Sequence, residues 1–324
     1  ALPEGWGHTG RLPSPGVGTL GDSPLGCGVL EVKGQMEPVP RGVLRGRWAM
    51  LGPGGRAFLQ VLLLCGLCVS ALGSGLMDRV HTELGYGHYA ERRVAWLPRS
   101  LAMPCNCLVN LGYMGLGAYW LRREAAPGPG PGLGQEQAYR QAVFAWMALV
   151  YGPVQWVRLS SQAQRAAALD QWLTLPIFAW VPAWVAELLR SRGQRGSRGW
   201  AWAWASSPLL TQAASVCSYG LALAHRRGFE LALGAHIAAA VLSGLAAQSA
   251  LGGRASRRHL VLAIASCCGF VGLKLLEQPL AAWGLLPAPL SGHSCSKVCD
   301  ILQFHHSFCF LDLLGREKEA RRHR

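Results

Sequence analysis

The chain is poor in charged residues. Only 15% of its 324 residues are Asp, Glu, Lys or Arg, and only 17 are acidic, whereas a soluble globular protein carries about 25% charged residues. Hydrophobic residues make up 51% of the chain, and the few charges lie mainly between long apolar segments. This charge deficit weighs against a soluble globular protein and favours a membrane protein.

Patterns typical of nucleic-acid binding are absent, although the formal net charge is +14. No zinc-finger spacing, RNA-recognition motif or basic helix is present, and arginines instead lie at the ends of apolar runs. We therefore expect membrane lipids and no nucleic acid as partners. The sequence indicates no particular protein partner.

A disulfide framework is also lacking. Eight of the eleven cysteines lie inside apolar stretches, where cysteine behaves as a small hydrophobic residue. These eight are Cys65, Cys68, Cys105, Cys107, Cys217, Cys267, Cys268 and Cys309.

What the chain does contain is a series of apolar segments, each about 15 to 21 residues long, which suits a hydrocarbon layer of ~30 Å at 1.5 Å per helical residue. They predict an all-α, multi-pass transmembrane helical bundle of about eight spans, with one leading helix and a seven-helix core. The predicted spans are 57–77, 101–121, 142–158, 171–189, 204–224, 231–251, 260–280 and 296–314.

The organisation along the chain follows from these spans. Residues 1–49 are rich in Gly, Pro and Arg, have no helical or strand period and begin with Ala, so we expect a disordered or spurious extension before Met50. Residues 50–100 would hold the leading helix and a loop, 101–314 the seven-helix membrane core, and 315–324 a basic cytoplasmic tail.

Two of the predicted spans have alternatives. The first is preceded by a short basic lead and is compatible with a cleaved signal peptide, but its length favours a retained anchor. The last contains Lys297, Asp300 and Asp312, so an amphipathic helix at the membrane surface is the alternative to a span.

Lysine and arginine predict the orientation. Segments on the side of the N-terminus hold 21 of them, and segments on the opposite side hold 9; without residues 1–49 the numbers are 16 and 9. The positive-inside rule then places both termini in the cytoplasm. The sequence does not distinguish an endomembrane from the plasma membrane.

Two residue classes carry structural expectations. Glycine and alanine recur in LGYMGLGAY, LALGAHIAAAVLSG and GLAAQSALGG, which predicts close packing between helices. Tryptophans near the predicted span ends are expected at the headgroup level. They are Trp96, Trp120, Trp156, Trp172, Trp200 and Trp283.

The stretches YGPVQWVRL, LDQWLTLPIFAW, SYGLAL, GFELALGAH, GFVGLKL and SKVCDILQFH closely resemble the transmembrane protein 187 family of vertebrates. The resemblance runs from about residue 50 to residue 314 and covers all the spans. It implies a multi-pass membrane protein and supplies no mechanism.

A more distant resemblance is to the alkaline ceramidases of the CREST superfamily, seven-helix membrane hydrolases and receptors. Asn106 and Asn110 match two asparagines of their first core helix, and AALDQWLTLP around Asp170 is similar to a later motif. Met103 and Cys107 depart from the Glu and Thr of that helix, as does Val109 from a Ser. The resemblance implies that the second to eighth segments form the core.

The hydrolase chemistry of these relatives requires zinc held by three histidines, two of them as His-x-x-x-His on the last helix. This chain has no histidine between His88 and His225, and the residue four positions after His305 is Cys309. A serine-hydrolase Gly-x-Ser-x-Gly motif is absent too. We therefore predict no catalytic residue, no metal ligand and no cofactor. A zinc site from His305, Cys309 and His236 is the alternative, which leaves the question of enzymatic activity open.

Polar residues inside the predicted spans are the candidate site, because an unpartnered polar group in hydrocarbon costs several kcal/mol. Two of these residues have structural alternatives: Asp170 could instead cap its helix, and Lys274 could pair with Glu277 or extend to the headgroups. We predict an intramembrane polar pocket floored by Asn106, Asn110, Asp170, Lys274 and His305.

These residues suggest three functions. The first is a non-catalytic membrane protein that binds a lipid or small ligand, as a relic of a membrane-hydrolase scaffold. The alternatives are a metal-dependent lipid amidohydrolase and a transporter, and broken helices or inverted repeats would favour the transporter.

Overall fold

The computed structural model describes residues 51–89, 91, 93–125, 134–190, 207–286 and 290–322. Over these residues the fold is all-helical, as predicted, and contains no strand. All described helices belong to the unit Arg45–Arg324. The predictions for residues 1–49 and for Trp200 lie outside the described residues.

The helices are α2 (Pro53–Gly73), α3 (Pro104–Leu108), α4 (Asn110–Ala125), α5 (Gln135–Ser161), α6 (Gln164–Arg190), α8 (Pro208–Ser218), α9 (Leu221–Ala224), α10 (Gly228–Leu251), α11 (Arg254–Leu275), α12 (Glu277–Ala282) and α13 (Gly292–Arg322), with short 3₁₀ turns η1 (Tyr86–Tyr89) and η2 (Arg99–Leu101).

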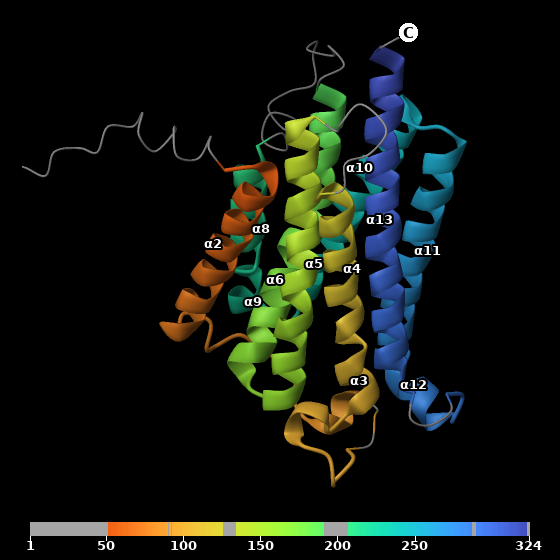
Figure 1. The fold of residues 1–324 in the computed structure, drawn as a ribbon. Helices are drawn as coiled ribbons and strands as arrows, with labels where there is room; N and C mark the ends of the chain where they lie inside the picture. The colour runs from red at the N-terminus through yellow and green to blue at the C-terminus, as the bar shows by residue number, and fades with distance from the viewer. Residues whose placement is uncertain are drawn as a thin grey trace, which may run out of the picture. The chain divides into compact units, whose positions relative to one another are not determined.

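The long helices lie beside one another and alternate in direction along the chain (Figure 1). α13 packs along α11, α4 packs along α5, and α10 packs along α6. α2 lies against α5 and α6. This alternation is what short connections between successive membrane-crossing helices produce.

Four helices of the described chain are long and apolar enough to cross a membrane: α2, α6 over Gln164–Leu189, α10 and α11. α5 and α13 are long enough as well, with 27 and 31 residues, but they carry more polar side chains. A helix of 31 residues is about 46 Å long. α13 therefore runs through the predicted last span and through most of the predicted basic tail.

Several predicted span boundaries differ from the structure, and the predicted span 101–121 is divided among η2, α3 and α4. The first helix ends at Gly73 and not at Met77, and Gly75 beyond it has a positive φ of 82° that favours glycine. α11 ends at Leu275, so Glu277 belongs to the separate short helix α12. The predicted span 204–224 is divided, because α8 ends at Ser218 and α9 begins at Leu221.

Aromatic side chains fill the centre of the bundle. The rings of Trp120 and Phe308 stack with centroids 4.7 Å apart, and Phe144 lies 4.4 Å from Phe308 and 5.3 Å from Phe304. Trp120 is fully buried, so its predicted place at the headgroup level is wrong. Buried aromatic rings contribute large apolar area to the core.

The other tryptophans divide between core and surface. Trp172 is also buried, stacked on Tyr219 at 5.2 Å, which corrects its prediction too. Trp96 and Trp283 are 83% and 65% exposed, as expected of rings at the membrane surface. Nearness to a span end therefore does not place a tryptophan ring at the headgroup level when the ring points into the bundle.

Glycines allow α4 and α5 to approach closely. A Cβ atom at Gly117 would lie 2.7 Å from the carbonyl oxygen of Ala145, and one at Gly152 would lie 2.8 Å from the carbonyl oxygen of Asn110. Such separations are too short for carbon and oxygen. The close packing predicted from LGYMGLGAY is confirmed at this seam.

Candidate polar site

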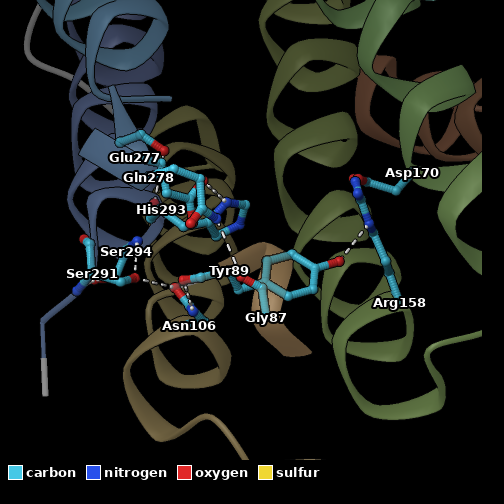
Figure 2. Close-up of polar contacts among 11 residues, drawn as sticks. Gly87, Tyr89, Asn106, Arg158, Asp170, Glu277, Gln278, Ser291, His293 and Ser294 are labelled. Atoms are coloured by element: carbon cyan, nitrogen blue, oxygen red, sulfur yellow. Dashed lines mark hydrogen bonds and ion pairs between the residues drawn. The ribbon is translucent and has the colours of Figure 1, made fainter. Parts of the chain in front are cut away.

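Polar side chains gather at the end of the bundle where α5 turns into α6, α3 begins and α13 begins. Figure 2 shows their arrangement. They come from the segment before α3, from α3, α5, α6 and α12, and from the start of α13 together with the residue before it. We call this group the polar cluster: Tyr89, Asn106, Arg158, Asp170, Glu277, Ser291, His293 and Ser294.

Asn106 ties the loop and α13 to α3. Its Nδ2 donates to the carbonyl oxygen of Tyr89 at 3.5 Å, and its Oδ1 accepts a hydrogen bond from Ser291 Oγ at 3.2 Å. Ser294 in turn bonds the backbone and side chain of Ser291. Asn106 is fully buried, and these partners satisfy an amide that would otherwise be costly in this environment.

Glu91 caps the first turn of α3, although it lies fourteen residues before Cys105 in the sequence. Its two carboxylate oxygens accept the backbone N–H groups of Cys105 and Asn106, both at 2.9 Å. These N–H groups have no partner within the helix. Burial raises the pKa of the Glu91 carboxyl, and the two N–H groups oppose that rise.

Arg158 and Asp170 form a buried ion pair between α5 and α6, joining Arg158 Nη1 to Asp170 Oδ2. Arg158 Nε also donates to the hydroxyl oxygen of Tyr89 at 3.1 Å. Burial raises the pKa of the Tyr89 hydroxyl even though the arginine charge lowers it. A buried charge persists only when it is paired in this way.

Glu277 and His293 form a second contact pair within the polar cluster. His293 Nδ1 lies 3.6 Å from Glu277 Oε2, and both side chains are almost completely buried. The His293 ring meets the edge of the Tyr89 ring with centroids 4.9 Å apart. Tyr89 therefore joins this pair to the ion pair of Arg158 (Figure 2).

A second layer lies one to two turns deeper in the bundle. Tyr113 on α4 donates its hydroxyl to Asp300 Oδ2 at 2.5 Å, and Lys297 Nζ lies 5.7 Å from the centre of the Tyr151 ring. Lys297 is within electrostatic range of both Asp170 and Asp300. The two layers together hold the cations Arg158, Lys274 and Lys297 and the carboxylates Asp170, Glu277 and Asp300.

Four of the five predicted pocket residues are at or near this site. Asn106 and Asp170 belong to the polar cluster, and Asn110 donates from Nδ2 to the carbonyl oxygen of Asn106 at 3.0 Å. Asp170 lies six residues inside α6 and pairs with Arg158, so the helix-cap alternative is wrong. Lys274 is partly buried and within electrostatic range of Asp170.

His305 does not lie with the other four. Its ring is 6.2 Å from that of Trp120 and 5.3 Å from that of His306, and its Nε2 lies 3.6 Å from Cys309 Sγ. Three cavities in the described part of the chain are lined by none of the five predicted residues. The polar residues thus pack against one another, and the residues predicted to floor a pocket do not line any of these three cavities.

The three residues of the alternative zinc site are not brought together. Among the described residues, no three His, Cys, Asp or Glu side chains lie close enough together to hold a metal ion. His236, the third ligand of the alternative site, bonds the carbonyl oxygen of Ala232 at 2.7 Å and Ser215 Oγ at 2.9 Å. Neither contact is with His305 or Cys309, so we derive no catalytic step through a metal.

The sequence prediction missed several members of the network. Arg158 ends the predicted span 142–158 and was not selected for the pocket, and Lys297 and Asp300 were interpreted as evidence against a last span. A signal did exist, since ionisable residues inside apolar segments mark interior or functional positions by default. Their partners depend on how each helix is rotated, which the spacing of residues does not give.

The apolar helices and the inward-facing ionic network define an α-helical integral membrane protein that crosses the bilayer several times. The TMEM187 protein family profile matches residues 57–312, and the chain belongs to that family.

Two relatives are named transmembrane protein 187. One from Bos taurus is 49% identical over 260 residues, which cover 80% of this chain and 97% of the relative. One from Homo sapiens is 50% identical over 257 residues, which cover 79% and 92%. No solved structure matches the chain significantly.

Proposed function

We propose that this membrane protein is a non-catalytic binder of a lipid or another small apolar ligand. The observation that carries the proposal is a cavity of about 330 Å³ between α6, α8 and α10. Ligand sites are commonly mostly apolar cavities of 300–1,000 Å³ with a few polar groups. The walls of this cavity are mainly alanine, proline and leucine side chains.

The polar cluster supports the non-catalytic part of the proposal. A general acid, base or nucleophile has to meet its substrate, whereas Asp170, Asn106 and His293 are buried and directed toward other side chains. We infer that the cluster holds the ends of five helices in register. Both termini lie in the cytoplasm in this proposal, as the distribution of Lys and Arg indicates.

The amidohydrolase is the second candidate, favoured by the contact of 3.6 Å between His305 Nε2 and Cys309 Sγ. These two side chains are suitable zinc ligands. Both lie on the same face of α13, one helical turn apart.

Purified protein distinguishes the two candidates. We expect mass spectrometry after detergent extraction to find a lipid retained at a stoichiometric level, and elemental analysis to find no stoichiometric zinc. Zinc that is lost from both His305→Ala and Cys309→Ala would favour the amidohydrolase. Protein that retains neither lipid nor metal through purification would contradict the proposal.

A further inference from the structure

The cavity between α6, α8 and α10 has one polar wall. Ser215 of α8 and His236 of α10 both line it, and Ser215 Oγ lies 2.9 Å from His236 Nε2. The other lining side chains are apolar except for Thr211. No Asp, Glu, Lys or Arg side chain lines the cavity.

The hydrogen bonds fix what the polar wall offers. His236 Nδ1 lies 2.7 Å from the carbonyl oxygen of Ala232, which only accepts, so Nδ1 carries the proton. Nε2 of the neutral ring is then an acceptor, and the Ser215 hydroxyl donates to it. A hydroxyl that donates its one proton keeps two acceptor positions on oxygen. Ser215 Oγ accepts no hydrogen bond from the described residues, so the wall offers an acceptor.

The mouth of the cavity lies at the exposed surface of α8 and α10. Leu210 and Ala214 of α8 are exposed, as are Ala235 and Ala239 of α10. His236 is eight residues into α10, about 12 Å along the helix. A ligand can therefore enter sideways from the bilayer.

We propose that this cavity binds a neutral lipid through a hydroxyl group that donates a hydrogen bond to Ser215 Oγ. The inference rests on the proposed function and adds the site and the ligand class. An uncharged apolar body matches the walls, and a hydrogen-bond donor matches the polar wall. Charged headgroups and ligands that carry only acceptors do not match it, because an unpaired polar group in such a site is costly.

The test uses two photoreactive, alkyne-tagged probes on the whole protein in nanodiscs: a long-chain alcohol and its methyl ether. The ether keeps the chain and lacks the donor. We expect the alcohol to label peptides of α8 or α10, and the ether to label them about threefold to tenfold more weakly, the range for one net hydrogen bond. Equal labelling by both probes would overturn the inference without requiring any variant to fold.

Two variants give independent evidence, each with a matched control. Ser215→Ala should lower labelling by the alcohol to the level of the ether, and Ala239→Leu should fill the mouth and block both probes. Ser249→Ala and Ala238→Leu change exposed positions of α10 that do not line the cavity, and labelling should stay as in the unchanged protein.

The possible results distinguish failure of this binding site from failure of the proposed function. Labelling at another position that Ala239→Leu leaves unchanged would reject this site and leave the proposed lipid binding standing. Failure of both probes to label, together with the absence of a co-purified lipid, would reject the proposed function as well.

Discussion

At the scale of the residue, ionisable side chains of the polar cluster are buried against one another. Arg158 lies against Asp170, and Glu277 lies against His293. The attraction within a buried pair only roughly offsets the cost of removing both charges from water, but losing one partner leaves the other charge unpaired. The intact pairs therefore contribute less to stability than the loss caused by removing one partner would suggest.

The first prediction concerns the Arg158–Asp170 pair. Asp170→Asn should lower the free energy of unfolding by about 3–5 kcal/mol, because the Arg158 charge is then buried without its partner. Unfolding followed by tryptophan fluorescence in detergent would measure this change. Arg165→Ala breaks an ion pair with Asp78 in which both side chains are about half exposed, and its effect should be much smaller. Equal losses in the two variants would contradict the role of burial.

The second prediction concerns pH. The folded protein raises the pKa of Glu91 above 4.5, so the folded state binds this proton more tightly than the unfolded state does. The contribution of Glu91 to stability is then greatest below pH 4.5 and falls as the pH rises through the raised pKa. Glu91→Gln should remove this part of the pH dependence of the unfolding midpoint.

The matched control for this titration is Glu83→Gln, which changes an exposed carboxyl in the same loop. We expect its pH profile to follow that of the unchanged protein. A Glu91→Gln profile that still declines over the same pH range as the unchanged protein would show that another group carries the dependence.

At the scale of the element, the α4–α5 seam shows how small residues replace the hydrophobic effect inside a membrane. Lipid tails are as apolar as leucine, so helices associate through close packing and hydrogen bonds. Gly117 brings the backbone of α4 against Ala145 and Leu149 of α5. The space at this point is too small for any side chain.

The third prediction follows from this seam. Gly117→Val should lower the free energy of unfolding by about 1–3 kcal/mol, since the added carbons overlap the α5 backbone. Gly115 lies on the same helix, and a Cβ atom added there would have no neighbour within 4 Å. Gly115→Val should have a small effect, and a chemical unfolding series on both variants would compare them. A loss at Gly115 as large as that at Gly117 would place the cause in helix propensity and not in packing.

Much of the element layout could be predicted from the sequence, and for a physical reason. Apolar runs of membrane length must be helical, because the bilayer offers no partner for backbone groups, and the described segments are helical. The break after Ser218 was missed, since no proline marks it and Gly220 is one of many glycines.

The candidate site was only partly predictable. Asn106 and Asn110 were expected to face other helices because amides are costly in hydrocarbon, and both are buried. His305 was grouped with them only because it is polar, whereas its position on α13 directs it toward Trp120. Tyr89 is the last residue of the 3₁₀ turn η1 and lies outside every predicted span, so no argument about membrane burial would have selected it.

At the scale of the whole molecule, the fourth prediction tests the orientation. Pro98→Asn creates a glycosylation acceptor with Ser100 in the exposed part of the loop before α3. If the termini are cytoplasmic, this loop faces the lumen, and the variant should gain one glycan that a glycosidase removes. A tag at the C-terminus should be digested by protease added to sealed microsomes. An unmodified loop together with a protected tag would reverse the orientation.

The aromatic centre of the bundle has a consequence for permeation. Trp120, Phe144, Phe304 and Phe308 occupy the region that α4, α5 and α13 enclose, and the paired charges of the polar cluster lie at one end of it. Ions moving along that axis would meet stacked rings where they need water or carbonyl oxygens. Planar bilayers that contain the protein should therefore carry no more current under an applied voltage than bare bilayers, and this electrical silence separates the protein from channels built on helical bundles.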